Sequence, residues 1–187
     1  MTATLNASTS SGVILTSDTS GELAIQSNGA TKMTVGASGV SLPSGTVAIN
    51  GPAFSAYANT TQSITGSTWT KVNFDNERFD SNNNFASSRF TPTVAGYYLL
   101  SANVYFNSNP TGQTILNLSI NGASSSGYGL NRFVSTGVGQ LSGSMVVYMN
   151  GSTDYVEIYF YSQGANTLNS GTSDTLVLFT GAMVRSA

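Results

Sequence analysis

Apolar and polar residues alternate with a period of two along several stretches of the chain, which is the pattern of β-strands whose two faces differ. The longest stretch runs from Gly96 to Phe106, and glycine at its start predicts a close backbone approach or a turn. One face of this stretch is apolar and is expected in the core: Tyr98, Leu100, Ala102, Val104 and Phe106. The other face is expected to point outward and holds Tyr97, Leu99, Ser101, Asn103 and Tyr105.

The same alternation returns in later parts of the chain. It places further core positions at Leu116, Leu118, Val156, Ile158 and Phe160. The first of these segments ends at Asn121-Gly122, the strongest local signal for a hairpin, and the segment from Ser144 to Met149 ends at a second Asn-Gly pair. No sustained helical period of apolar residues occurs. Many short strands with a turn signal about every ten residues predict an all-β sandwich or barrel.

Residues 1–50 differ from the rest because their apolar residues come in isolated pairs punctuated by glycine. The pairs are Leu23 and Ile25, Met33 and Val35, Val40 and Leu42, and Val47 and Ile49. They predict minimal strands joined by glycine turns, which bury almost nothing in a single chain. One interpretation is a disordered linker. The regular return of the pairs favours a self-associating, trimeric β-structured stalk, so we divide the chain into an anchoring stalk, 1–51, and a head, 52–187.

Composition narrows the class of partner. Only 7% of the residues are charged, against about 25% in an ordinary soluble domain, so much of the exterior is hydroxyl, amide and glycine or is buried against copies of the chain. The net charge of -2 provides no basic stripe, which argues against nucleic acid. Cysteine is absent, which excludes disulfides and thiolate metal sites. No apolar run approaches the roughly 18 residues of a membrane span and no secretion signal is visible, so no membrane partner is expected.

Six motifs follow one another along the head: Pro52 to Ala56, Val72-Asn73-Phe74-Asp75-Asn76-Glu77, Phe79-Asp80 with Phe85, Gly96-Tyr97-Tyr98, Met149 to Val156, and Phe179 to Val184. In this order they resemble the globular head of the complement q subunit and its tumour-necrosis-factor-like relatives. Two departures are Ser152 and Thr153 inserted before Asp154, and Ala182 where an aromatic residue is common. The resemblance implies an antiparallel jelly-roll head that forms a homotrimer and that binds and assembles rather than catalyses. The departures leave open any ligand of the family.

Catalysis is not expected from the residue inventory. Histidine and cysteine are absent, which removes the commonest general base, the commonest zinc ligands and thiol nucleophiles. Asp75, Glu77 and Asp80 lie close together in the sequence, and a glycosidase would need two such carboxylates across a sugar cleft. Arg78 and Arg89 are expected to pair with these carboxylates in a turn instead. No catalytic, cofactor-binding or metal-binding residue is therefore predicted.

Asp80, Asn82 and Asn84 have the alternate spacing that begins an EF-hand calcium loop. The sixth position of such a loop would be Phe85 rather than glycine, and the twelfth would be Thr91 rather than glutamate. Side chains that cap their own turn explain the run, and a calcium site of another kind is the alternative.

Tyrosines recur on the outward faces of two expected strands. They are Tyr97 and Tyr105 on the first, and Tyr155, Tyr159 and Tyr161 on the second. Rows of exposed aromatic residues either stack on sugars or are buried by another protomer. In the trimeric heads that this sequence resembles, such a face lies along the threefold axis, so we expect these five residues at the trimer interface. A platform for a glycan is the alternative.

The stalk carries a second resemblance. Residues 16–29, TSDTSGELAIQSNG, resemble segments common in bacteriophage fibre and virion surface proteins. Together the two resemblances imply a non-enzymatic structural protein of the bacteriophage virion surface, either a homotrimeric capsid decoration (cement) protein or a short head fibre. Its stalk would contact other virion proteins of the capsid or tail. The alternative is a receptor-binding tail-fibre tip that recognises host cell-surface polysaccharide, and a remote alternative is a tailspike depolymerase.

Overall fold

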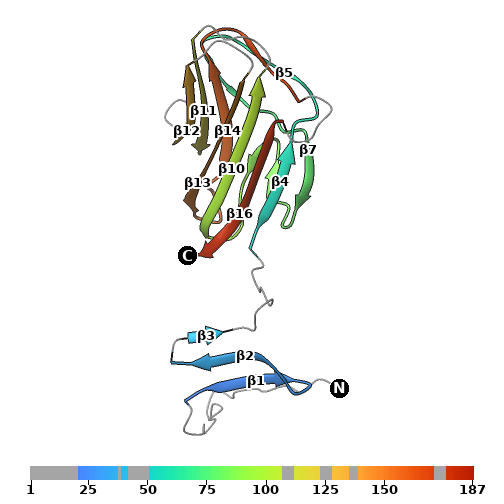
Figure 1. The fold of residues 1–187 in the computed structure, drawn as a ribbon, viewed down its shortest axis with the longest axis vertical. Coiled ribbons are helices and arrows are strands. Elements are labelled where there is room, and N and C mark those ends of the chain that lie inside the picture. Colours follow the sequence, from blue (N-terminus) through green and yellow to red (C-terminus); the bar gives the residue numbers. More distant parts are fainter. Residues whose placement is uncertain are drawn as a thin grey trace. The chain divides into compact units, whose positions relative to one another are not determined.

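The computed structural model describes residues 21–37, 39–41, 51–106, 112–122, 128–134, 139–170 and 176–187, which form strands and connections without a helix. The chain divides into two compact units, residues 1–49 and 50–187 (Figure 1). The boundary expected at residues 51 and 52 lies next to this division.

The first unit contains a three-stranded antiparallel sheet of β1 (Leu23–Ser27), β2 (Ala30–Gly36) and β3 (Gly39–Ser41). Asn28 and Gly29 join β1 to β2 with φ angles of 51° and 74°, as a two-residue type I′ hairpin requires. Leu23 lies opposite Val35, and Val35 lies opposite Val40, so these apolar residues share one face. Of the sequence patterns, residues 16–20, Leu42, Val47 and Ile49 lie outside the described residues.

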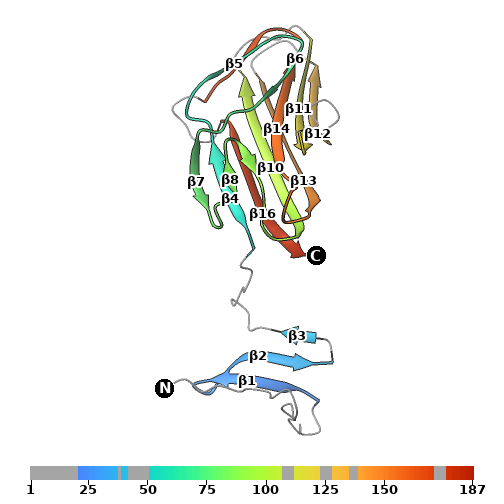
Figure 2. The same ribbon diagram turned by 180° about the vertical axis from the view of Figure 1, so that it is seen from behind.

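The second unit, the head, is a sandwich of two antiparallel sheets (Figures 1 and 2). The sheet that we call the β10 sheet has the order β5 (Gln62–Ile64), β15 (Asn166–Leu168), β10 (Gly96–Phe106), β16 (Leu178–Ser186), β4 (Ala53–Tyr57) and β7 (Asn76–Asp80), and β13 (Gly139–Met149) also pairs with β10. The β14 sheet has the order β12 (Tyr128–Val134), β11 (Gln113–Ile120), β14 (Val156–Ser162), β9 (Arg89–Phe90) and β8 (Phe85–Ala86), and β6 (Thr68–Lys71) pairs with β14. The chain crosses repeatedly between the sheets, and the predicted all-β jelly-roll class is confirmed.

The core lies between the two sheets. The ten side chains expected there are all buried: Tyr98, Leu100, Ala102, Val104, Phe106, Leu116, Leu118, Val156, Ile158 and Phe160. Aromatic rings from opposite sheets meet, with 4.4 Å between the ring centroids of Phe54 in β4 and Phe90 in β9, and 5.7 Å between those of Phe106 and Phe160. Burial of one such side chain contributes about 1.5–3 kcal/mol, so these contacts hold the two sheets together.

The central strand β10 pairs with β13 along its whole length, from Gly96 opposite Met149 to Phe106 opposite Gly139. Gly96 marks the close backbone approach predicted for it, because a Cβ added there would lie 2.5 Å from the carbonyl oxygen of Arg185. Two residues on, the buried hydroxyl of Tyr98 donates a hydrogen bond to the carbonyl of Val94 at 2.7 Å.

Neither Asn-Gly pair of the head forms a two-residue hairpin. Strands β11 and β12 begin their pairing at Leu118 and Tyr128, so the connection after Asn121 is longer. Asn121 is held elsewhere, because its backbone N–H donates to the carbonyl of Tyr155 at 3.0 Å and its side-chain oxygen accepts from the N–H of Tyr155 at 3.1 Å. Asn150 lies between β13 and β14, which belong to different sheets. The two Asn-Gly pairs therefore lie in turns at the ends of strands rather than in two-residue hairpins.

Candidate functional site

The five tyrosines expected at one interface lie on both sheets of the sandwich. Tyr97 and Tyr105 are on the outer face of β10, whereas Tyr159 and Tyr161 are on β14 and Tyr155 precedes it. The structure therefore does not bring the five together on one face. Alternation along a strand reveals which residues point outward, but it does not reveal which sheet the strand joins.

The outer face of the β10 sheet carries four exposed apolar residues on adjacent strands. Tyr97 lies opposite Tyr148 and Leu99 lies opposite Val146. The two tyrosine rings meet at 5.6 Å between centroids, and the four side chains are 43% to 54% exposed. We call these four residues the apolar face. Soluble monomers seldom leave such clusters uncovered, so the apolar face is a candidate contact surface.

A shallow groove adjoins the apolar face between β4, β10 and β16. Its volume is about 240 Å³, and its lining is mostly apolar and includes Leu99, Ala182 and Phe79. The ring of Phe79, on the edge strand β7, is 54% exposed. The groove extends the candidate contact surface from the apolar face towards the edge of the sheet.

Sequence reasoning missed three of the four residues of the apolar face, namely Leu99, Val146 and Tyr148. Leu99 was placed on the outward side of its strand, and an apolar residue in that position was the signal that could have found it. The pairing of β10 with β13 could not be read from the sequence, because the two strands are joined through the other sheet.

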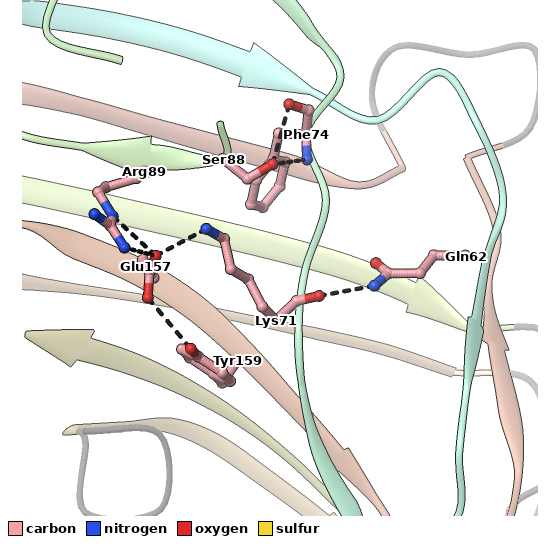
Figure 3. Close-up of polar contacts among 7 residues, drawn as sticks. All are labelled: Gln62, Lys71, Phe74, Ser88, Arg89, Glu157 and Tyr159. Atoms are coloured by element: carbon pink, nitrogen blue, oxygen red, sulfur yellow. Dashed lines mark hydrogen bonds and ion pairs between the residues drawn. The ribbon is translucent and has the colours of Figure 1, made fainter. Parts of the chain in front are cut away.

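The outer face of the β14 sheet carries a charged cluster instead. Lys71 from β6 and Arg89 from β9 converge on Glu157 of β14 (Figure 3). Its Oε1 accepts hydrogen bonds from Lys71 Nζ at 2.8 Å and from Arg89 Nε at 2.9 Å, and Arg89 Nη2 lies 2.8 Å from the same oxygen. Its Oε2 accepts from the hydroxyl of Tyr159 at 3.2 Å. Glu157 is only 2% exposed, so its charge depends on these partners.

Backbone contacts hold the strands that carry the two cations. The side-chain amide of Gln62 donates to the carbonyl of Lys71 at 2.7 Å. The hydroxyl of Ser88, in the turn before Arg89, accepts from the N–H of Phe74 at 2.8 Å (Figure 3). These hydrogen bonds hold the backbone from which the side chains of Lys71 and Arg89 extend.

The cluster carries a net positive charge at neutral pH. Burial raises the pKa of the Glu157 carboxyl, but hydrogen bonds and positive charges from Lys71 and Arg89 outweigh burial, and the pKa lies below its usual value of 4.5. Burial also raises the pKa of the Tyr159 hydroxyl, and the negative charge of Glu157 raises it further. Two cations and one carboxylate leave a net charge of +1.

The three tyrosines near β14 make contacts within their own chain. The guanidinium of Arg89 lies over the ring of Tyr155 at 3.8 Å, which is a cation–π contact. The hydroxyl of Tyr159 binds Glu157, and the ring of Tyr161 lies 5.3 Å from that of Trp69. These tyrosines build the outer face of the β14 sheet, and their place at a trimer interface stays a prediction.

The acidic residues near the turn at 75–80 take structural roles. The expected partner Arg89 binds Glu157 instead, because β9 runs beside β14. Asp75 accepts from the N–H of Asn59 and the hydroxyl of Thr60. Asp80 accepts from the N–H groups of Asn82 at 3.3 Å and Phe85 at 2.7 Å, as a turn-capping side chain does. In the part of the chain that the structure describes, no three acidic residues form a group that could hold a metal ion.

Comparison with known proteins identifies the fold of the head. The globular domain of zebrafish complement 1qA protein matches 73% of this chain and 99% of its own length, with a TM-score of 0.53 and 21% identity. The crystal structure of murine APRIL at pH 8.5 matches 71% of this chain and 98% of its own length, with a TM-score of 0.54 and 13% identity. The structure of Eiger TNF from S. frugiperda matches 73% of this chain and 95% of its own length, with a TM-score of 0.53 and 9% identity. The head is thus a complement-q/tumour-necrosis-factor-like jelly roll.

No protein-family model and no curated protein sequence matches the chain. Among the described residues, no helix has the length and apolar character needed to cross a membrane.

Proposed function

We propose that this chain is a non-enzymatic structural protein of a bacteriophage virion, a homotrimeric capsid decoration protein or short head fibre displayed on the particle surface. The observation that carries the proposal is the apolar face of the head. Burial of the exposed part of Leu99 alone would contribute about 1 kcal/mol per chain. A trimer buries three copies, about 3 kcal/mol, which is roughly a hundredfold in the dissociation constant.

The first unit supports the same assembly. Its described residues form one sheet of three short strands, which leaves Leu23, Ile25 and Val40 exposed by 40%, 46% and 65%. A sheet of this size with one uncovered apolar face is marginal alone in water, and further copies of the chain would complete its core. We therefore assign anchoring and part of the trimer contact to residues 1–51, and the remaining trimer contact and display on the particle surface to the head.

A role in the virion rests on the resemblance of residues 16–29 to bacteriophage fibre and virion surface proteins. The way in which the buried acidic group of the head is paired is consistent with a structural role. Among the described residues, Glu157 is the one buried carboxylate, and two cations already neutralise it. A depolymerase would need two carboxylates across a sugar cleft.

Oligomeric mass tests the assembly. Light scattering of the purified protein should give three times the chain mass of 19.4 kDa. Leu99→Asp should shift the mass towards the monomer, because burial at the interface would strip water from the added carboxylate. Tyr128→Asp, an exposed site 53% open on the other sheet, is the matched control and should remain trimeric. A folded wild-type monomer at micromolar concentration would contradict the assembly.

Attachment to the particle tests the virion role. Cryo-electron microscopy of intact particles should locate the protein on the capsid surface. A chain that begins at Pro52 should fold as a β-rich head but fail to bind particles that lack the native protein. If the shortened chain still decorates such particles, the first unit is not the anchor.

The second candidate is a receptor-binding tail-fibre tip that recognises host cell-surface polysaccharide. Half-buried aromatic rings beside fixed charges on the outer face of the β14 sheet favour it, because a sugar can stack on the open part of such a ring. Location at the tail rather than the capsid in the same particles would select this candidate.

A further inference from the structure

A polar pocket opens beside the charged cluster. Its volume is about 510 Å³, within the usual range for ligand sites. Lys71 and Arg89 line it together with residues of the β7–β8 and β8–β9 turns and of the segment after β9, and its lining contains no carboxylate. The chain has only six basic residues, and two of them meet here from positions 18 apart.

The two cations are held in place before any ligand arrives. Glu157 binds the Nε and Nη2 atoms of Arg89, and the ring of Tyr155 packs against the plane of the guanidinium. Five N–H groups are available on a guanidinium and three on an ammonium, so contact with one carboxylate oxygen leaves donors on both side chains. The side chains of Lys71 and Arg89 are 29% and 42% exposed, which lets those donors reach solvent and a ligand.

The rest of the lining offers amide and hydroxyl groups. Asn83, Ser87 and Thr91 contribute such groups, and Ala86 is the apolar exception among the lining residues. Ser87 has a φ angle of 51° because it is the first residue of the two-residue type I′ turn, Ser87-Ser88, that joins Ala86 to Arg89. Asn83 has a φ angle of 53°, a left-handed backbone that asparagine tolerates in turns.

We propose that this pocket binds a carboxylate-bearing saccharide, with Lys71 and Arg89 on the acid group and Asn83, Ser87 and Thr91 on the sugar hydroxyls. A guanidinium and an ammonium fit a carboxylate through charge-assisted hydrogen bonds. Hydroxyl and amide groups that both donate and accept fit a sugar ring bearing several hydroxyls.

The charge of the cluster favours a carboxylate over a phosphate. Its net charge of +1 balances a single negative charge, whereas a phosphate monoester carries about -1.5 to -2 at neutral pH. Phosphate sites also use converging backbone N–H groups at a helix start, and the described part of the head contains no helix.

The site does not depend on the virion role, and it lies on the β14 sheet rather than on the β10 sheet that the trimer would cover. Binding by the intact trimer is therefore expected. Loss of binding with the trimer intact, or loss of the trimer with binding intact, would separate the failure of one proposal from that of the other.

Calorimetric titration of the full-length protein at low salt would test the site. The probes are a hexuronate oligosaccharide, the same oligosaccharide with its carboxyl groups reduced to hydroxymethyl groups, and inorganic phosphate. The hexuronate should bind, and the reduced form should bind at least about tenfold more weakly because it lacks the charge-assisted hydrogen bonds. Equal binding of the reduced form, displacement by equimolar phosphate, or no binding at roughly 10 mM hexuronate would each overturn the proposal.

Variants distinguish a ligand contact from a structural role. Lys71→Gln keeps a donor for Glu157 and removes the charge, and it should weaken hexuronate binding about tenfold. Lys71→Arg should retain binding, and Thr91→Val, which removes only a hydroxyl, should weaken binding about three- to tenfold without changing the unfolding temperature. Arg78→Gln is the control for loss of one positive charge away from the pocket and should bind as the wild type does. Equal affinity in all four variants would refute the assignment even if one of them were unstable.

Discussion

Leu100 of β10 and Gly181 of β16 are directly opposite each other, and their sizes are matched in the core. Leu100 is fully buried. A Cβ added to Gly181 would lie 2.4 Å from Leu100 Cδ2 and 2.7 Å from Phe54 Cε1, closer than side-chain atoms pack. Leu100 therefore occupies space that only a glycine at position 181 leaves open.

This match predicts the outcome of a double-mutant cycle. Leu100→Ala should lower the free energy of unfolding by about 2–5 kcal/mol through lost burial and a cavity. Gly181→Ala should lower it by about 1–3 kcal/mol through overpacking. In the double variant the added methyl group enters the space vacated by Leu100, while its contact with Phe54 remains. The combined loss should therefore be smaller than the sum by about 1–2 kcal/mol.

Denaturant unfolding of the wild type, both single variants and the double variant measures this coupling. Protein concentration must be the same throughout, because the stability of a trimer depends on concentration. Losses that add within about 0.5 kcal/mol would show that the two residues do not share space, and the register between β10 and β16 would then be wrong.

Three further predictions concern single contacts. Asn103→Ala should lower the free energy of unfolding, measured by thermal unfolding, by about 1 kcal/mol, because Asn103 Nδ2 donates to the carbonyl of Leu176 at 2.7 Å. Ser101→Ala should lower it by no more than about 0.5 kcal/mol, and equal losses in the two variants would contradict this reasoning. Gly96→Ala should lower the free energy of unfolding by about 1–3 kcal/mol, because the added Cβ would clash with the carbonyl oxygen of Arg185. Unchanged stability in the same assay would refute the close approach of the two backbones. The stability that ionised Glu157 contributes should be complete above pH 4.5 and should fall as the pH drops through the lowered pKa of Glu157 in the folded state. Glu157→Gln should therefore make the free energy of unfolding fall less steeply at acidic pH, and an unchanged slope would show that the ion pairs of Glu157 contribute nothing.

Local alternation was enough to predict the inward residues of β10 and β14, because burial in a sandwich follows the side-chain period of a strand. Alternation also places Ser101 and Asn103 on the outward face, where alanine is usually tolerated, but the hydrogen bond from Asn103 to Leu176 alters that expectation for Asn103. The jelly-roll class followed from ordered motifs rather than from alternation. These inferences needed only neighbours in sequence or a resemblance along the whole head.

Contacts between distant strands could not be predicted in the same way. Arg89 and Glu157 are 68 positions apart, and nothing in their local sequence marks them as partners. The two residues meet because β9 pairs with β14, an arrangement that belongs to the topology of the sandwich. The same topology places Leu99 beside Val146 and puts the two groups of tyrosines on different sheets. Both candidate surfaces of the head therefore depend on pairings that became visible only in the fold.

The placement of charge argues that the two surfaces bind by different physical means. Strands β4, β10 and β13, which form much of the β10 sheet, contain no charged residue. Association through their outer face would depend on apolar burial, which salts such as sulfate strengthen. On the β14 sheet, Lys71 and Arg89 flank the polar pocket, and an attraction between their partly exposed charges and an acidic sugar weakens as salt screens it. If one sheet serves assembly and the other recognition, as proposed, added salt is therefore expected to release a bound saccharide from the head while leaving the trimer assembled.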